Sequence, residues 1–181
     1  MRKNITIMMI VISTMFMLTG CYMAFKEYYS EEEYREIWDL TGFWHGYDGI
    51  SPFFPERIDN LEVNKFLCRY DQRLPVGEGV QLFMEIQYTD KKMFDKEYEK
   101  IKSMAFECNE FFDEMDFSAY AVRLIKDDST EYALIDEKQQ IIYYIFLHCL
   151  PKEEIEFEDK FVPSCYVDYW DKYFELKKID S

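Results

Sequence analysis

The sequence has few of the side chains on which enzyme catalysis usually depends. It contains only two histidines, His45 and His148, in 181 residues. His148 precedes Cys149, but adjacent residues of a strand point to opposite faces of a sheet, so these two are not expected to form a catalytic pair. The sequence also contains no G-x-G-x-x-G, P-loop, G-x-S-x-G or H-E-x-x-H motif. These absences favour a non-catalytic protein that needs no cofactor.

Basic residues are also scarce, and they form no cluster. The chain has 21 lysines and arginines against 36 aspartates and glutamates, a net charge of −15. A surface of this sign repels the phosphate backbone, so nucleic-acid binding is not expected. Such acidity can mark a disordered chain, but aromatic residues make up 19% of the sequence, far more than a solvated chain carries. The composition therefore predicts a folded domain with an acidic surface.

The apolar run near the N-terminus is too short to span a membrane. It covers residues 5–18, which is 14 residues, whereas a spanning helix needs about 20. Arg2 and Lys3 precede it, and small residues and Cys21 follow it. This order is typical of a secretory signal peptide. The alternative is a buried core helix, which the flanking charges disfavour.

The apolar run is followed by Leu18-Thr19-Gly20-Cys21, which resembles the lipobox of bacterial lipoproteins. The resemblance covers about the first 21 residues. It implies lipid transfer to the Cys21 thiol, cleavage before Cys21, and a mature chain held by acyl chains such as palmitate at the extracytoplasmic face of the cell membrane. Two acyl chains give stable attachment, whereas one is marginal. The membrane is therefore the expected partner, through the lipid on Cys21.

The predicted organisation follows from that cleavage. Residues 1–20 form the signal peptide, residues 21–30 the lipidated cysteine with a short aromatic tether, and residues 31–181 a single globular domain. Removing the leader changes the net charge from −15 to −17, because it contains two basic residues and no acid. The remaining 161 residues fit one domain. Alternatively, the tether residues begin the first helix. The domain loosely resembles the small, uncharacterised α+β domains of other bacterial lipoproteins.

The four cysteines after Cys21 have no spacing typical of a zinc site or a redox pair. Their neighbours are apolar or aromatic, which favours small buried thiols. Disulfides remain the alternative, with three possible pairings. These cysteines are Cys68, Cys108, Cys149 and Cys165.

Alternation of apolar and polar residues predicts an antiparallel sheet. Residues 80–88 read as a half-buried strand. The core face of that strand carries Leu82, Met84, Ile86 and Tyr88. Residues 140–150 are apolar on both faces, so they are expected to form a strand that lies centrally or has cover on both sides. Further strands are predicted at residues 63–70, 119–126 and 131–135.

Capping residues mark the predicted helices. Asp90 is expected to cap a helix over residues 91–108. The apolar stripe of that helix consists of Phe94, Tyr98, Ile101, Ala105 and Cys108. Ser30 and Glu33 match a capping box that opens a short N-terminal helix, and another short helix is predicted from Asp168 on. The predicted fold class is α+β, a single antiparallel sheet of about five strands with the long helix packed on one face.

The most suggestive candidate binding segment is residues 43–55, which read FWHGYDGISPFFP. Two glycines and two prolines predict a loop. Trp44 and Tyr47 could stack on a flat ligand, with Asp48 accepting hydroxyl groups and His45 beside them, an arrangement that suits a sugar ring. The plainer interpretation is that Trp44 and Tyr47 cap the core and that His45 is exposed.

Two acidic stretches are expected to be solvated rather than metal-binding. Asp113, Glu114 and Asp116 lie close together but lack the calcium-loop pattern. The second stretch is expected to form a solvent-exposed surface. Its acidic residues are Glu153, Glu154, Glu156, Glu158 and Asp159. No metal site is therefore predicted.

Three functional hypotheses follow, in order of preference. The first is a membrane-anchored surface lipoprotein whose domain is a non-catalytic interaction module for an envelope protein or cell-wall component. The second is a cell-wall or glycan binder that uses the 43–55 loop. The third is an enzyme of the envelope. Burial of Trp44, Tyr47 and Phe53 would argue against the second hypothesis.

Overall fold

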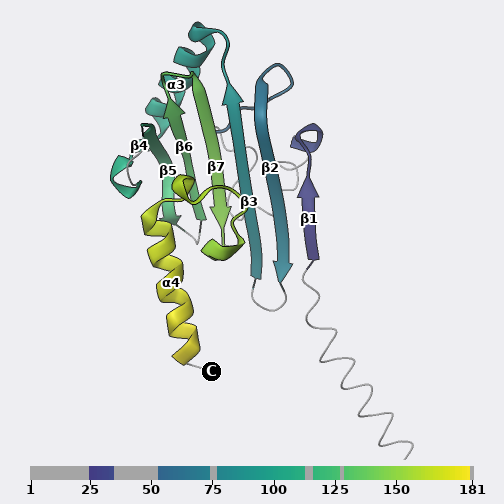
Figure 1. The fold of residues 1–181 in the computed structure, drawn as a ribbon, viewed down its shortest axis with the longest axis vertical. Helices are drawn as coiled ribbons and strands as arrows, with labels where there is room; N and C mark the ends of the chain where they lie inside the picture. Colours follow the sequence, from purple (N-terminus) through teal and green to yellow (C-terminus); the bar gives the residue numbers. More distant parts are fainter. Residues whose placement is uncertain (1–24, 35–52, 74–76, 113–115, 127–128, 180–181) are drawn as a thin grey trace, which may run out of the picture.

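A single antiparallel sheet of seven strands organises the domain (Figure 1). The computed structural model describes residues 25–34, 53–73, 77–112, 116–126 and 129–179. Across the sheet the strands run in the order β1-β2-β3-β7-β6-β5-β4. Their bounds are β1 Phe25–Tyr29, β2 Glu62–Arg73, β3 Gly77–Gln87, β4 Phe106–Glu107, β5 Ser118–Lys126, β6 Ser129–Asp136 and β7 Ile141–His148. The described helices are α3 (Lys91–Met104) and α4 (Ser164–Ile179). The predicted α+β class with one antiparallel sheet is therefore confirmed.

Both faces of the sheet are covered, each by its own hydrophobic core. The first core joins one face to α3 and to residues 53–61. The second core joins the other face to residues 151–163, here called the covering segment, and to the first turns of α4. The covering segment contains two short 3₁₀ turns, η3 (Lys152–Glu154) and η4 (Asp159–Phe161). Because two layers flank the sheet, its middle strands are buried on both sides.

Strand β7 lies fourth of the seven strands, as its two apolar faces predict. Tyr144 points into the first core and Ile145 into the second, and both are fully buried. Hydrogen bonds to β3 and β6 satisfy both edges of the backbone. The prediction of a strand that lies centrally or has cover on both sides is confirmed.

The predicted number of strands was too low, because the two edge strands are short. Phe25–Tyr29, read as tether, pairs with β2 as the edge strand β1, with Tyr28 opposite Arg69. Phe106–Glu107 pairs with β5 at the other edge. Strands of five and two residues are too short to show the alternation of apolar and polar residues that signals a strand. Hydrogen-bonded pairing with a longer neighbouring strand orders them.

Helix α3 begins as predicted and ends earlier. The Asp90 carboxylate accepts a hydrogen bond from the Lys92 amide at 2.8 Å, which confirms the predicted cap. Phe94 and Ile101 of the predicted stripe are buried in the first core. Placing Cys108 in that stripe was wrong, since the chain becomes extended after Met104 and carries Cys108 into the second core.

Strand β3 presents its predicted residues to the first core, but its other face is not solvated. Leu82, Met84, Ile86 and Tyr88 all point inward. On the opposite face Gln81 and Phe83 are fully buried as well. Phe83 stacks on Phe157 of the covering segment, with ring centroids 5.0 Å apart. The half-buried prediction was wrong for this part of β3, because an acidic segment distant in sequence covers it.

Two elements near the ends of the domain differ from the prediction, the N-terminal helical turn and helix α4. Glu33 accepts a hydrogen bond from the Ser30 amide at 2.8 Å, as the N3 residue of a capping box does, and a second one from the Ser30 hydroxyl at 2.9 Å. These bonds lower the pKa of the Glu33 carboxyl. The box opens a 3₁₀ turn, η1 (Glu31–Glu33), and residues 35–52 lie outside the described part of the chain. Helix α4 begins at Ser164, four residues before the predicted Asp168.

The four cysteines of the domain are thiols that are not joined in disulfides, as the apolar neighbourhoods predict. Cys68 and Cys108 are buried, and Cys149 and Cys165 are half-buried. Burial raises the pKa of the Cys108 thiol to about 12 and that of Cys68 further. These thiols are therefore neutral packing groups at ordinary pH.

Candidate functional site

The residues singled out for lipid attachment and ligand binding lie outside the described part of the chain. They are Cys21 of the lipobox-like motif and Trp44, His45, Tyr47 and Asp48 of the 43–55 loop. What is said of them above therefore stays a prediction.

The last aromatic residues of the 43–55 loop belong to the first core. Phe53 is 0% exposed, and Phe54 is almost fully buried beside it. Both rings contact Tyr144 of β7, with centroid distances of 6.3 and 5.7 Å. This part of the loop packs against the sheet and cannot stack on an external ligand, which removes one of the three rings considered for a glycan site.

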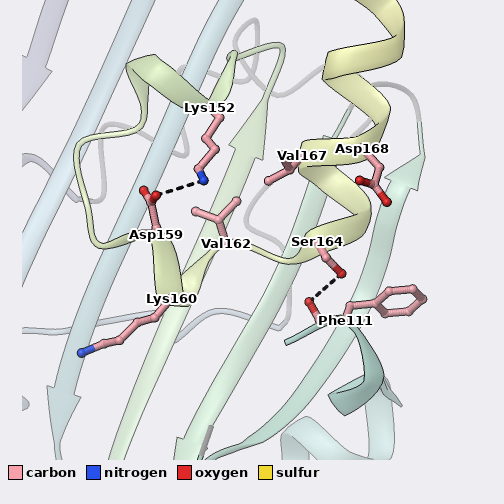
Figure 2. Close-up of a pocket in the computed structure, with 8 residues that line it drawn as sticks. All are labelled: Phe111, Lys152, Asp159, Lys160, Val162, Ser164, Val167 and Asp168. Atoms are coloured by element: carbon pink, nitrogen blue, oxygen red, sulfur yellow. Dashed lines mark hydrogen bonds and ion pairs between the residues drawn. The ribbon is translucent and has the colours of Figure 1, made fainter. Parts of the chain in front are cut away.

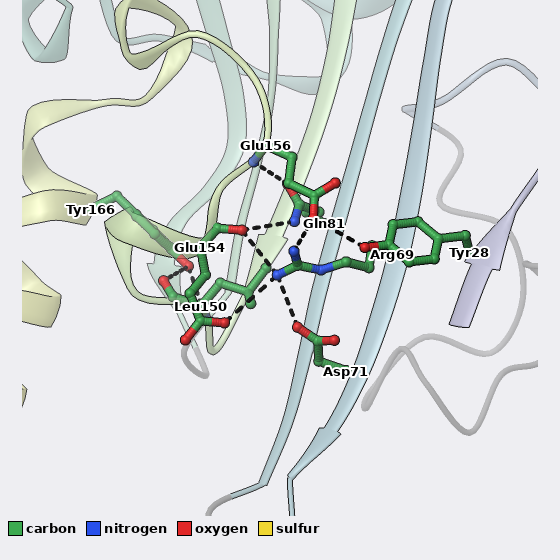
Figure 3. Close-up of polar contacts among 8 residues, drawn as sticks. All are labelled: Tyr28, Arg69, Asp71, Gln81, Leu150, Glu154, Glu156 and Tyr166. Carbon is green, nitrogen blue, oxygen red and sulfur yellow. Dashed lines mark hydrogen bonds and ion pairs between the residues drawn. The ribbon is translucent and has the colours of Figure 1, made fainter. Parts of the chain in front are cut away.

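The most extensive polar cluster surrounds a buried arginine on the other face of the sheet (Figure 3). The Arg69 side chain on β2 is 3% exposed, and that of Asp71, two residues further along the same face, is 0% exposed. Cross-strand pairing places Tyr28 of β1 and Gln81 of β3 on either side of Arg69. The cluster thus assembles from a single row across three strands.

The guanidinium of Arg69 joins the sheet to the covering segment. Its Nη2 lies 2.9 Å from Asp71 Oδ2 and donates to the Glu154 carbonyl at 2.9 Å. Its Nη1 donates to the Glu156 carboxylate, which also accepts from the Tyr28 hydroxyl at 3.3 Å. A buried cation requires such paired partners, because removing one leaves an uncompensated charge.

Gln81 completes the attachment of the covering segment. Its Nε2 donates to the Glu154 carbonyl at 3.1 Å, and its Oε1 accepts from the Glu156 amide at 2.9 Å. The Gln81 side-chain amide therefore acts as the hydrogen-bond partner of two backbone groups in the covering segment, the Glu154 carbonyl and the Glu156 amide, in place of a second backbone. The reading of Glu154 as part of a solvated face was wrong, because this half-buried residue binds Arg69. Glu156 also binds Arg69 but is exposed, as predicted, and so are Glu153, Glu158 and Asp159.

A hollow of about 390 Å³, here called the Lys152 pocket, opens between the covering segment and the start of α4 (Figure 2). Lys152 and Asp159, which both line the pocket, form an ion pair at 3.0 Å. The Ser164 hydroxyl donates to the Phe111 carbonyl at 3.1 Å, which ties α4 to the segment after β4. The pocket is lined by Phe111, Lys152, Asp159, Lys160, Val162, Ser164, Val167 and Asp168. It thus offers charges of both signs beside apolar side chains.

A second hollow of about 400 Å³ lies beside α3, between that helix and residues 55–61. The Glu97 carboxylate at its wall accepts hydrogen bonds from Lys100 at 2.7 Å and from the Tyr144 hydroxyl at 3.0 Å. Burial raises the pKa of Tyr144, and likewise that of Tyr88, whose hydroxyl lies 3.5 Å away. Both phenols stay protonated near neutral pH and act as hydrogen-bond donors rather than bases.

One histidine forms a polar contact between neighbouring strands. His148 Nδ1 lies 2.8 Å from the Ser129 hydroxyl, and the two residues are directly paired between β7 and β6. A serine–histidine contact can activate a nucleophile, but Ser129 is only 4% exposed and lines neither hollow. The contact therefore secures the end of the sheet.

Within the described ranges, no three histidine, cysteine or acidic side chains are grouped so that they could hold a metal ion. Asp116 of the predicted acidic turn is exposed and pairs with Lys138 at 3.1 Å. Asp113 and Glu114 lie outside the described residues. The described helices also include none with the length and apolar character that crossing a bilayer requires.

Comparison with known proteins adds no relative: no protein-family model, curated protein or solved structure matches this chain.

Proposed function

We propose that the protein is a bacterial surface lipoprotein, held at the extracytoplasmic face of the cell membrane by acyl chains on Cys21, with a non-catalytic interaction module as its folded domain. The observation that carries the proposal is the order of the first 21 residues. Two basic residues, a 14-residue apolar run and Leu18-Thr19-Gly20-Cys21 follow one another. A lipidated cysteine needs no spanning helix, since two acyl chains suffice for stable attachment.

The chemistry of the described polar side chains supports binding over catalysis. The charges of the Arg69 cluster are engaged in joining the covering segment to the sheet. Burial raises the pKa of Tyr144 and Tyr88, away from the range of an acid or base that works near neutral pH. These groups stabilise the fold, so the module acts through its surface.

The Lys152 pocket is the described surface that suits a partner best. It is concave, and its lysines are already paired with acids, Lys152 with Asp159 and Lys160 with Glu158 at 2.7 Å. Exposed ion pairs contribute little to folding, so a partner with charged groups can exchange them at small cost. An envelope protein or a cell-wall component offers such groups.

Membrane fractionation of the native host tests the anchor. The wild-type chain is expected in the membrane fraction and to incorporate labelled fatty acid. Cys21→Ser is expected to lose the label and to leave the membrane or accumulate unprocessed. Cys165→Ser is the matched control, because it removes a different thiol, which is half-buried in the domain, and should leave labelling unchanged. Undiminished label in Cys21→Ser would overturn the proposal.

A further inference from the structure

We infer that one particular end of the sheet faces the bilayer and that the C-terminal half of α4 lies against the lipid headgroups; this inference rests on the proposed lipid anchor. The end concerned, here called the anchor end, is where β1 and β3 begin and where β2 and β7 finish. Phe25 at the start of β1 lies opposite Gln72, next to the end of β2, and Val80 lies opposite His148. The partner is a lipid surface.

The length of chain between the anchor and the sheet leaves little freedom. Only residues 22–24 separate Cys21 from Phe25, so the two Cα atoms are at most about 14 Å apart at full extension. The headgroup layer on each side of a bilayer is about 5–8 Å thick. The start of β1 must therefore lie at or just above the headgroups, and the other strand ends of the anchor end lie with it.

Helix α4 projects from this same end. Its first turn is fixed to the chain just beyond β7, because the Tyr166 hydroxyl donates to the Leu150 carbonyl at 2.8 Å and accepts from the Leu150 amide at 3.2 Å. Among the α4 residues whose side chains the structure describes, which end at Lys172, Trp170 is the last one buried in the second core, and Asp171 and Lys172 are exposed. Figure 1 shows the helix running past the ends of the strands toward the C-terminus.

The projecting part has the length and the charge for this contact. Residues 171–179 span about 14 Å as a helix, the same distance that the tether allows. Residues 171–181 hold three lysines and three acids, equal numbers of each sign, in a chain whose net charge is −15. The lysines are attracted to anionic headgroups, from which the acidic rest of the domain is repelled.

Fluorescence quenching in vesicles tests the orientation. Mature lipidated protein, with Cys149→Ser and Cys165→Ser to remove the accessible thiols, is reconstituted in phosphatidylcholine–phosphatidylglycerol vesicles that contain a headgroup-attached quencher. One fluorophore is attached at Asp171→Cys and, in a second sample, at Asp116→Cys. Both positions are exposed aspartates, but Asp116 precedes β5 at the opposite end of the sheet. Quenching is expected to be several-fold stronger at position 171.

The possible outcomes test the lipid anchor and the orientation of the domain separately. Protein that fails to sediment with the vesicles would overturn the lipid anchor and the orientation with it. Protein that sediments but is quenched equally at both positions would overturn the orientation alone. In the Asp171→Cys sample, Lys172→Glu is expected to weaken quenching on anionic vesicles and not on pure phosphatidylcholine, with sedimentation unchanged. Quenching unaffected by Lys172→Glu, or cross-linking of α4 to another protein chain in place of lipid, would contradict headgroup contact.

Discussion

Arg69 and Asp71 form an ion pair of 2.9 Å inside the domain, on the face of the sheet that the covering segment closes. The same distance separates Arg57 from Asp59, yet that pair is exposed to solvent. Comparing the two pairs therefore shows how burial changes the contribution of an ion pair to the free energy of unfolding. When a buried arginine is removed, its carboxylate partners keep their negative charge without a nearby cation, whereas water already screens the charges of an exposed pair.

Replacing Arg69 by methionine is expected to lower the free energy of unfolding by about 3–5 kcal/mol, because Asp71 and Glu156 then lose their cation. Arg57→Met is the matched control and should cost less than about 1 kcal/mol. Urea unfolding followed by tryptophan fluorescence measures both. Equal effects of the two substitutions would show that the Arg69 cluster does not hold the fold.

Gln81→Leu is expected to loosen the covering segment while leaving the sheet intact. The substitution removes both hydrogen bonds to that segment, at Glu154 and Glu156, so the Glu156 amide should exchange with deuterium faster. The amides of β7 report on the sheet and should keep their protection. Asn64→Leu is a suitable control, since Asn64 is exposed and its side chain donates to Glu85 alone among the described hydrogen bonds. Unchanged exchange at Glu156 would count against this attachment.

Ile145→Asp is expected to unfold the domain or to destabilise it by several kcal/mol, because it places an unpaired carboxylate at the centre of the sheet. Met93→Asp makes a similar chemical change at an exposed position in the first turn of α3 and should be close to neutral. Thermal unfolding by circular dichroism distinguishes them. A cooperative transition of Ile145→Asp at the wild-type temperature would show that β7 is misplaced.

Stability is expected to fall in alkaline solution. Burial raises the pKa of Cys108 to about 12 from an ordinary thiol value of 9.0, and it raises the pKa values of Tyr132 and Tyr144 above 10.0. The unfolded chain therefore loses protons that the folded chain keeps, so stability is greatest below about pH 9 and declines toward pH 12. Urea midpoints measured across this range should decrease steadily. A urea midpoint that increases as the pH is raised beyond 9 would contradict the burial of these groups.

The parts of the fold that could be predicted are those whose signal is local. Apolar residues on both faces mark β7 as central, alternation orients Leu82 and Met84, and Asp90 marks the start of α3. Each of these features depends on residues within one element. The edge strands β1 and β4 could not be predicted in this way, because five and two residues owe their order to pairing.

The Arg69 cluster was missed because its partners are distant in sequence. Glu156 lies 87 residues beyond Arg69, and its acidic neighbours are typical of a solvated stretch. One signal was present: Asp71 stands two residues after Arg69, just beyond the predicted strand 63–70, so continuing the extended chain by one residue places both side chains on one face. Nothing local indicates that the covering segment bends back over them, since burial of Phe83 against Phe157 is a tertiary contact.

The proposed membrane anchoring depends on the chemical state of the Cys21 sulfur, and intact mass spectrometry of protein purified from its native host measures that state directly. The account predicts a chain that begins at Cys21, without residues 1–20, and carries the added mass of acyl chains at that residue. A chain that retains Met1 and has an unmodified thiol at position 21 would contradict the account.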